Sequence, residues 1–386
     1  RSVIIPSIAN GITEVNNILR SDDVLRTINA FKLMGVKIEE KNNCLLIYGK
    51  GLWSLSKPKD KIDLGNSGTS ARLLIGLLSA QNFESFLLGD HSLSNRPMDR
   101  IISPLNKMGA CIESKNDRLP IIVRGNKLKN IKYGLDIPSA QVKSGISLAA
   151  LFIDDQTEII EKNITRNHTE IMLKLFEANI EIKKINQNNH IFIRGNKELK
   201  PKNISIPSDL SSAAFLIVAA LINENSKIEM KNINLNSTRS GFLTTIIRMG
   251  GQVIIKNKKE VNGEIVGDIH VKHSKLKGCE LDKDITKLMI DEFPILSIAA
   301  SFANSPSIFR GLEELKIKES NRLELIRYNL ENCGVYCEVN NNNLLIDPTK
   351  KFDCKSNIIK TNTDHRIAMA FAIMGTKLGV ILKIQD

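Results

Sequence analysis

Five short clusters of small, polar and charged residues each stand directly before a long apolar segment. The clusters occupy residues 66–72, 139–143, 208–212, 291–294 and 364–366, and each following segment is predicted to be a helix buried on all sides. A helix N-terminus has unpaired backbone N–H groups and a partial positive charge, so it attracts anions. Several such helices beginning in one place would therefore form a site for a heavily anionic ligand.

The charge of three residues in these clusters is unexpected. Arg72, Lys143 and Arg366 are cations in or near a first helical turn, where the helix dipole disfavours each by about 0.3–1 kcal/mol. Long basic side chains can instead extend to a surface from such positions, and this alternative is open for each residue alone. Their recurrence favours anion binding, since local stability would select Asp or Glu there.

Further cations lie at other predicted helix starts. Arg96 stands before Pro97, a favoured first helical residue, and Arg166 precedes another predicted helix in the same way. A helix beginning near Lys318 would place Lys318 and Arg322 on one face, where an anion would relieve their repulsion. Each of these cations alone could be a solvated helix end, but their recurrence indicates binding residues.

Carboxylates and imidazoles near these cations are candidates for proton transfer. Asp291 precedes a buried helix and is either the helix N-cap or a catalytic base. Glu319 lies between Lys318 and Arg322, which would hold it ionised, whereas burial would favour its neutral form. His365 is either a hydrogen-bonding residue of a helix start or a proton-transfer group.

The composition describes an ordinary globular protein with a basic charge. The chain has 386 residues, 42% of them apolar, and a net charge of +12, which suits phosphorylated metabolites or nucleic acid. No apolar run approaches the roughly 20 residues that cross a bilayer. The six cysteines lack the spacing of a zinc site, so no metal is predicted. A reducing, cytoplasmic location is predicted for the protein. Residues 65–70 are rich in Gly and hydroxyl side chains but lack the lysine of a P-loop.

A second pattern recurs along the chain: an amphipathic helix, a turn that usually contains Gly, and two strands. Its five copies have helices predicted at residues 22–34, 97–108, 169–176, 240–249 and 319–332. The third copy has Glu177 where the others have a turn glycine. With the buried helices, these copies predict a mixed α/β protein of related subdomains, three in each of two domains. The domain boundary is predicted near residues 201–207, which two prolines bracket, and the last subdomain is incomplete.

The charged segments, taken in order, resemble those of the 5-enolpyruvylshikimate-3-phosphate (EPSP) synthase family. The resemblance extends over essentially the whole chain and rests on residues 64–72, 96–100, 139–144, 166–170, 318–322 and 364–366. The Ser-Ala-Gln-Val-Lys-Ser and Arg-Pro-Met sequences look like the branch called class II. The resemblance implies two domains, 1–206 and 207–386, each of three βαβαββ units in the inside-out α/β architecture of enolpyruvyl transferases. It also implies that the domains close on substrates held between them.

The resemblance implies an enzyme of the shikimate pathway to chorismate and the aromatic amino acids. Its reaction would transfer the enolpyruvyl group of phosphoenolpyruvate to the 5-hydroxyl of shikimate 3-phosphate through a tetrahedral intermediate, releasing phosphate. It would act as a monomer, without a cofactor, nucleic acid or a membrane. The family is the target of glyphosate, and resistant members often carry Ala at the position of Gly68.

A role for each matched residue is also implied. Positions that contact shikimate 3-phosphate are matched by Arg1, Ser139, Ala140, Gln141, Arg166, Asp291 and Lys318. Positions around phosphoenolpyruvate are matched by Gly68, Arg96, Gln141, Arg322 and Arg366. Asp291 matches the residue proposed as base for the attacking hydroxyl, and Glu319 one implicated in proton transfer at the methylene carbon. Six further residues are expected to support the site, namely Asn66, Thr69, Arg72, Lys143, Asp364 and His365.

One departure from the family concerns the two ends of the chain. Family members carry an essential Lys-Ser pair shortly before the position of Arg1 and a further Lys beyond that of Asp386. We therefore expect the chain to be trimmed at both ends, and this stretch alone to bind substrates weakly and turn over poorly, whereas the full-length protein is expected to be active.

Three other classes of protein are alternatives. UDP-N-acetylglucosamine enolpyruvyl transferases share the architecture, but the segment around Cys111 does not resemble their cysteine-bearing loop. RNA 3′-phosphate cyclases share distant elements of the repeat, but a nucleotide-binding signature is missing from the sequence. A non-catalytic nucleic-acid binder is disfavoured, because the arginines lie at helix starts rather than in one run with aromatic residues.

Overall fold

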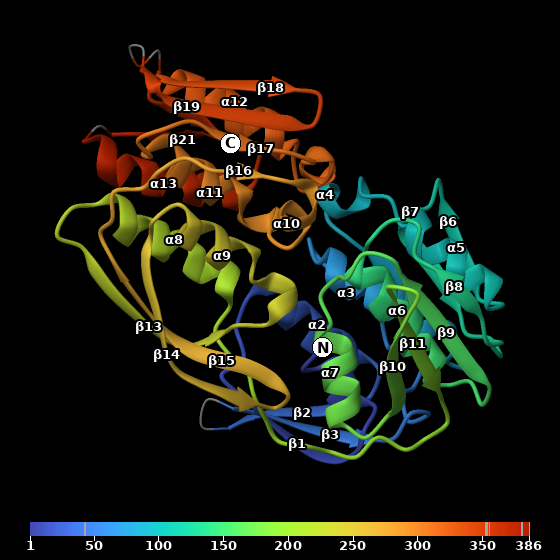
Figure 1. The fold of residues 1–386 in the computed structure, drawn as a ribbon. Helices are drawn as coiled ribbons and strands as arrows, with labels where there is room; N and C mark the ends of the chain where they lie inside the picture. The colour runs from blue at the N-terminus through green and yellow to red at the C-terminus, as the bar shows by residue number, and fades with distance from the viewer. Residues whose placement is uncertain (42–43, 352–353, 355, 380, 386) are drawn as a thin grey trace. The chain divides into compact units, whose positions relative to one another are not determined.

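The chain is divided into two compact units with separate apolar cores. The computed structural model describes residues 1–41, 44–351, 354, 356–379 and 381–385 (Figure 1). One unit is Arg1–Ile206 and the other is Pro207–Asp386. The core of the first unit contains residues from Val3 to Ile204, and the core of the second contains residues from Leu210 to Met374.

The first unit repeats one sheet topology three times. Each sheet pairs a short strand in parallel with a longer strand, which is followed by two antiparallel neighbours. The first sheet has the order β12 (Ile204–Ser205), β1 (Asn10–Asn16), β3 (Cys44–Lys50) and β2 (Lys37–Lys41). The second has the order β4 (Ile62–Asp63), β5 (Glu84–Leu88), β7 (Arg118–Arg124) and β6 (Cys111–Lys115). The third has the order β8 (Lys132–Gly134), β9 (Gln156–Glu161), β11 (Asn188–Arg194) and β10 (Asn179–Ile185).

The helices of the first unit include two that are almost wholly buried, α3 (Gly68–Ser79) and α6 (Ala140–Ala150). The prediction of fully buried helices is confirmed for this pair. The remaining helices are α1 (Ile4–Ser7), α2 (Asp22–Leu33), α4 (His91–Ser94), α5 (Asp99–Lys107) and α7 (His168–Leu175). Since α5 begins at Asp99, the prediction that Pro97 is a first helical residue is wrong.

The second unit repeats the same topology less completely. One sheet has the full order, with β16 (Glu280–Leu281), β17 (Ser307–Phe309), β19 (Asn343–Lys351) and β18 (Val335–Asn340). A three-stranded antiparallel sheet is formed by β13 (Lys227–Asn234), β15 (Glu264–Lys272) and β14 (Gln252–Val261) (Figure 1). A parallel pair consists of β20 (Ile358–Lys360) and β21 (Lys383–Gln385).

Three long apolar helices of the second unit pack on one another: α8 (Leu210–Ile222), α11 (Phe293–Ser301) and α13 (His365–Leu378) (Figure 1). In α11 every residue is buried, whereas α13 buries only Ile367, Ala370, Phe371 and Met374. The prediction of burial on all sides is therefore wrong for α13, which contacts α8 and α11 through one face. The other helices are α9 (Gly241–Arg248), α10 (Lys283–Lys287) and α12 (Arg322–Asn332), with short 3₁₀ turns η1 (Ser237–Arg239), η2 (Ile290–Glu292) and η3 (Glu313–Ile317). Among the described residues, no helix combines the length and apolar character needed to cross a membrane.

The turn after each amphipathic helix uses one backbone conformation. Gly35, Gly109, Gly250 and Gly334 have positive φ angles between 80° and 95° at this turn. Glu177, which replaces the glycine in the third copy, also has a positive φ of 61°. The left-handed conformation reverses the chain between helix and strand, and glycine adopts it without the steric cost of a Cβ atom.

Helices α3 and α6 approach each other at backbone distance. A Cβ atom built on Gly76 of α3 would lie 2.1 Å from the carbonyl oxygen of Gly145 in α6. A side chain cannot occupy that space, so glycine at this crossing allows the close approach. The approach brings the polar N-terminal clusters of α3 and α6 into contact, as the hydrogen bonds below show.

Candidate active site

The N-terminal turns of α3 and α6 are joined by side-chain hydrogen bonds. Arg72 Nη1 donates to Gln141 Oε1 over 2.8 Å and to the carbonyl oxygen of Gly68 over 3.2 Å. Gln141 Nε2 in turn donates to Thr69 Oγ1 over 2.9 Å. The structure thus brings together four residues that the sequence places in two clusters about 70 positions apart.

Arginines crowd around the start of α3. Arg96 donates to the side-chain oxygen of Asn66, and Arg72 Nη2 donates to the carbonyl oxygen of Pro97 over 3.1 Å. A Cβ atom built on Gly68 would lie 3.0 Å from Arg72 Nη1 and 3.2 Å from Arg96 Nη1. Burial, together with the positive charges of Arg96 and Arg100, lowers the pKa of Arg72 to about 10. An anion bound beside Gly68 would reverse this unfavourable electrostatic environment.

The start of α6 carries the predicted residues Ser139, Ala140 and Lys143. Ser139 is the N-cap, and its hydroxyl accepts from the backbone N–H of Val142 over 3.4 Å. Ala140, the first residue of the helix, is half-buried. Lys143, which is expected to support the site, is 1% exposed and lies between two buried carboxylates, so its ammonium is paired inside the first unit.

Arg1 contacts both α6 and α7, and Arg166 lies in the segment just before α7. Arg1 donates from Nη2 to Ser144 Oγ over 3.1 Å and from Nε to the hydroxyl of Thr169. Ser144 Oγ and Thr169 Oγ1 are 2.7 Å apart. Arg166 is half-buried in the segment between β9 and α7, two residues before α7 begins.

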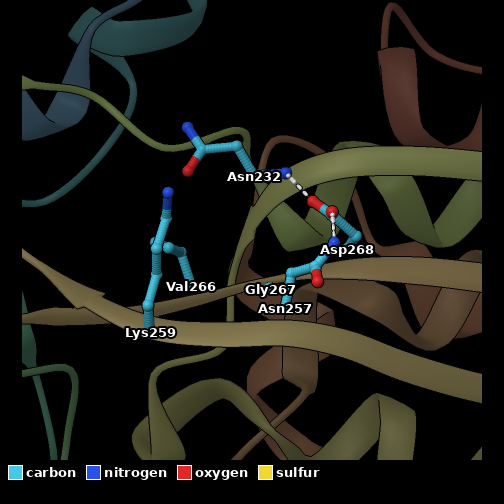
Figure 2. Close-up of a pocket in the computed structure, with 6 residues that line it drawn as sticks. All are labelled: Asn232, Asn257, Lys259, Val266, Gly267 and Asp268. Atoms are coloured by element: carbon cyan, nitrogen blue, oxygen red, sulfur yellow. Dashed lines mark hydrogen bonds between the residues drawn. The ribbon is translucent and has the colours of Figure 1, made fainter.

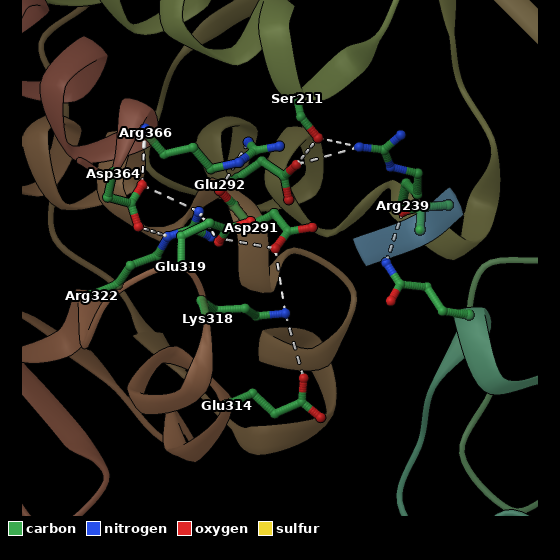
Figure 3. A network of polar contacts seen from close by, with 12 residues as sticks. Ser211, Arg239, Asp291, Glu292, Glu314, Lys318, Glu319, Arg322, Asp364 and Arg366 are labelled. Atoms are coloured by element: carbon green, nitrogen blue, oxygen red, sulfur yellow. Dashed lines mark hydrogen bonds and ion pairs between the residues drawn. The ribbon is translucent and has the colours of Figure 1, made fainter. Parts of the chain in front are cut away.

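Arg322 is the centre of the polar network of the second unit (Figure 3). Its side chain is 1% exposed, and its Nε donates to Asp364 Oδ2 over 2.8 Å. Its Nη2 donates to Glu319 Oε2 over 2.6 Å and to Asp364 Oδ1 over 3.3 Å. Nη1 is 3.6 Å from Asp291 Oδ1 and has no hydrogen-bond partner among the described residues. One guanidinium therefore faces three carboxylates and retains an unused donor.

Asp291 lies in η2, immediately before α11. Its Oδ1 is 3.5 Å from Lys318 Nζ, and its backbone carbonyl oxygen accepts from Arg366 Nη1 over 3.2 Å (Figure 3). The N-cap of α11 is Glu292, without a side-chain capping bond, so Asp291 does not cap this helix. Its carboxylate is directed toward cations instead.

The prediction that a helix begins near Lys318 is wrong. The helix α12 begins at Arg322, with Asn321 as N-cap, and Lys318 follows the 3₁₀ turn η3. The Asn321 side chain accepts from the N–H of Glu324 and thereby fixes the helix start there. Lys318 and Arg322 therefore do not share a helix face, and they meet at Asp291 because the chain turns between them.

Asp364 caps α13 and is completely buried. Its Oδ1 accepts from the backbone N–H of Arg366 over 3.0 Å, and its Oδ2 accepts from Ser320 Oγ over 2.9 Å. Burial opposes the ionised form, but the hydrogen bonds and charge of Arg322 outweigh it and lower the pKa of Asp364. His365, the next residue, has an exposed side chain.

A second cluster beside Asp291 was not predicted. Glu292 is 4% exposed and accepts from the hydroxyl of Ser211, which also accepts from Arg239 (Figure 3). Arg239 Nη1 donates to Asp209 Oδ1 over 2.9 Å. Asp209 caps α8. A sequence signal exists for Ser211, which belongs to the polar start of α8, whereas Arg239 lies in no such cluster.

A separate cavity of about 280 Å³ lies beside the β14–β15 hairpin and contains none of the predicted site residues. Its lining is Asn232, Asn257, Lys259, Val266, Gly267 and Asp268 (Figure 2). Both oxygens of Asp268 accept hydrogen bonds, from the backbone N–H of Asn232 and from Asn257 Nδ2. The carboxylate is thus used within the hairpin.

Comparisons with known proteins identify one family. The family described as EPSP synthase (3-phosphoshikimate 1-carboxyvinyltransferase) matches residues 1–386. The chain is 43% identical over 376 residues to the 3-phosphoshikimate 1-carboxyvinyltransferase of Thermoanaerobacter sp. (strain X514), covering 97% of the chain and 87% of that protein. It is 42% identical to the enzyme of the same name from Ruthia magnifica, covering 100% of the chain and 88% of that protein.

Solved structures agree with the sequence relatives. An EPSP synthase from Acinetobacter baumannii is similar with a TM-score of 0.84 and 39% identity, covering 100% of this chain and 86% of that one. The enolpyruvyl transferase NikO from Streptomyces tendae is similar with a TM-score of 0.71 at 15% identity, covering 97% of this chain and 85% of that one, which shows the fold alone. Since the match covers residues 1–386, the chain belongs to the EPSP synthase family, which transfers the enolpyruvyl group of phosphoenolpyruvate to shikimate 3-phosphate.

Proposed function

We propose that Asp291 and Glu319 move the protons of this reaction, and that nearby arginines and Lys318 bind the anionic groups of the two substrates. The observation that supports this proposal is the arrangement around Arg322. Glu319 is 2.6 Å from Arg322 Nη2, and Asp291 is 3.6 Å from Arg322 Nη1. Two carboxylates therefore lie beside one buried cation, and a reaction with two proton transfers can use one carboxylate for each proton.

The protons and electrons balance with these two groups. In the addition step, the 5-hydroxyl oxygen forms a bond to C2 of phosphoenolpyruvate, and the hydroxyl proton passes to Asp291. In the same step, C3 receives a proton from the carboxylic acid form of Glu319. In elimination, C3 loses a proton to Glu319, the C–C double bond forms again, and the C2–O bond to phosphate breaks while Asp291 gives its proton to the departing phosphate. Each carboxylate thus acts as acid in one direction and base in the other.

The anionic groups are assigned to cations and helix starts. For shikimate 3-phosphate we propose Arg1, Ser139, Ala140, Gln141, Arg166, Asp291 and Lys318. For phosphoenolpyruvate we propose Gly68, Arg96, Gln141, Arg322 and Arg366. The unused Nη1 donor of Arg322 and the crowded arginines beside Gly68 support the second set. Bidentate arginine contacts suit phosphate and carboxylate groups in both geometry and charge.

The remaining assignments concern partners and location. We infer that the protein acts as a monomer on these two small substrates, in the cytoplasm. The cytoplasmic assignment is supported by six cysteines that are all free thiols.

The decisive measurement is phosphate release from phosphoenolpyruvate with shikimate 3-phosphate, compared with UDP-N-acetylglucosamine. We expect release only with the former. Asp291→Asn should lower kcat by at least about 100-fold while binding of shikimate 3-phosphate persists, because the variant keeps the shape but not the base. Glu314→Gln is the matched control, since Glu314 lies 3.6 Å from Lys318 Nζ, where Asp291 lies 3.5 Å from it, but Glu314 has no assigned role. Equal losses in both variants would contradict the assignment of Asp291.

A further inference from the structure

Lys143 forms a buried ion cluster inside the first unit. Its Nζ is 2.9 Å from Glu161 Oε1 and 2.6 Å from Glu170 Oε1. The exposed fraction is 1% for Lys143 and 2% for each glutamate. Lys143 belongs to α6, Glu161 ends β9, and Glu170 lies in the first turn of α7. We call Lys143, Glu161 and Glu170 the buried triad.

Stability does not account for the buried triad. Removing three charges from water is costly, and apolar side chains of similar volume commonly replace such clusters without loss of stability. Two carboxylates also exceed one ammonium in charge, and Glu170 Oε2 is buried without a hydrogen-bond partner among the described residues. The buried triad is costly in free energy, but its contacts are directional. Such a cluster is suited to holding the elements around it in one arrangement.

The contacts of the triad lead to the residues assigned to shikimate 3-phosphate. Glu161 Oε1 also accepts from the backbone N–H of Thr165 over 2.8 Å and from the Thr165 hydroxyl over 2.5 Å. Thr165 directly precedes Arg166, so Glu161 fixes the backbone on which Arg166 stands. Lys143 lies in the first turns of α6, which begins at Ser139 and Ala140.

Glu170, the second glutamate of the buried triad, is adjacent to the residues that Arg1 contacts. Glu170 follows Thr169, whose hydroxyl is 2.7 Å from Ser144 Oγ, and Arg1 donates to both hydroxyls. Lys143–Glu170 and Ser144–Thr169 are thus two adjacent buried links between α6 and α7, and the second also contacts Arg1. Arg1, Arg166 and the start of α6 are therefore all tied to one buried ammonium.

We propose that Lys143, Glu161 and Glu170 are positioning residues for shikimate 3-phosphate. They do not contact the substrate. They hold Arg1, Arg166 and the α6 start in the relative positions that the phosphate and the hydroxylated ring of shikimate 3-phosphate require. The inference rests on the proposed assignment of these groups to shikimate 3-phosphate, and it predicts a selective effect on that substrate.

The test uses substitutions that keep the shape of the cluster. Lys143→Met would leave two carboxylates buried without a cation, and such a variant can fail to fold. Glu161→Gln and Glu170→Gln each retain a carbonyl oxygen that can accept from Lys143 Nζ. Both are made in the full chain, and binding is measured by calorimetry with shikimate 3-phosphate and, separately, with phosphoenolpyruvate.

We expect Glu161→Gln to raise the dissociation constant for shikimate 3-phosphate by about tenfold or more, and that for phosphoenolpyruvate by less than about threefold. Amide hydrogen exchange of residues 162–167 should become faster, because Thr165 loses its ionised acceptor. A variant that melts at a lower temperature but binds shikimate 3-phosphate as tightly as the parent chain would overturn the inference, since the triad would then be structural only.

Two further variants separate this inference from the proposed function. Glu181→Gln is the matched control, because Glu181 pairs with Lys183 over 2.9 Å on exposed β10, and it should change neither binding nor exchange. Arg166→Ala is the reference for the substrate assignment. Weaker binding in Arg166→Ala but not in Glu161→Gln overturns the positioning role alone. Unchanged binding in both overturns the assignment of Arg166, and the positioning role with it.

Discussion

Arg322 shows how a single residue organises the candidate site of the second unit. Three carboxylates, Asp291, Glu319 and Asp364, lie around it. Their charges raise its pKa even though burial acts in the opposite direction. Removing one member of such a buried cluster leaves a charge without its partner, which costs more than the cluster contributes.

Asp364→Asn should therefore show a characteristic pH dependence. At pH 7 the variant is expected to be less stable by about 3–5 kcal/mol, because Arg322 loses a buried ionic partner. The folded-state pKa of Asp364 lies below its ordinary value of 3.8, so its contribution is complete above that pH and is lost as the pH falls through the lowered pKa. Urea unfolding from pH 7 to pH 3 measures the difference.

We expect the stability difference between the parent chain and Asp364→Asn to be constant near neutral pH and to shrink only below about pH 4. Asp284→Asn is the control, since Asp284 is 90% exposed and its loss should change stability by less than about 0.5 kcal/mol. A difference that stays constant down to pH 3 would contradict the ionic role of Asp364.

Gly68→Ala is predicted to lower sensitivity to glyphosate. The added methyl group would lie 3.0 Å from Arg72 Nη1 and 3.2 Å from Arg96 Nη1, so it would narrow the space beside these guanidinium groups. We expect the inhibition constant to rise by about tenfold or more, because small misplacements at a charged site have large effects. Inhibition kinetics against phosphoenolpyruvate measure the change.

The matched control for that prediction is Gly134→Ala. A Cβ atom at Gly134 would meet nothing within 4 Å, so inhibition should be unchanged. An unchanged inhibition constant in Gly68→Ala would count against placing the phosphoenolpyruvate site beside Gly68.

At the scale of elements, the helix–turn–strand repeat depends on one left-handed residue in each turn. Four copies use glycine there, and the third copy uses Glu177 with a φ of 61°. An L residue in this region carries a steric cost of about 1–2 kcal/mol. Glu177 also forms exposed ion pairs with Lys200 and Lys202, which contribute about 0–1 kcal/mol.

Glu177→Gly should therefore be more stable than Glu177→Ala by about 1 kcal/mol. Both variants lose the same ion pairs, so their difference isolates the backbone conformation. Equilibrium urea unfolding of the two variants measures it. Equal stabilities would show that the turn relaxes out of the left-handed region when the side chain is small.

At the scale of the whole molecule, each unit contains its own core and its own sheets. The first unit includes β12, whose Ile204 is 3% exposed and lies opposite Val15 of β1. The chain thus returns to its first sheet just before the boundary, and all three sheets of the first unit are complete within residues 1–206.

We predict that residues 1–206 fold alone, with one cooperative urea transition followed by circular dichroism. A shorter chain that ends at residue 202 lacks β12, so it loses the burial of Ile204 and should be less stable by about 2 kcal/mol or more. The absence of a cooperative transition in both chains would show that the first unit needs the second to fold.

The sequence determined much of this protein through local patterns. The charged segments were sufficient to recognise the family, and periodicity located α3, α6, α8 and α11 and the five helix–turn–strand copies within a few residues. The repeat also located the turn at Glu177, because the position between helix and strand requires the left-handed backbone conformation whichever residue occupies it. Such features depend on residues near one another in the chain.

Only the tertiary structure decided which side chains meet. Arg322 and Asp364 are 42 positions apart, Arg366 and the Asp291 carbonyl are 75 apart, and Arg239 reaches Ser211 from 28 positions away. Lys143, which resembles an anion-binding cation in the sequence, is instead neutralised by buried glutamates. The periodicity of apolar residues indicates which face of a helix or strand is apolar, but not which other element covers that face. Burial and ionic partners are therefore decided by the packing of the elements.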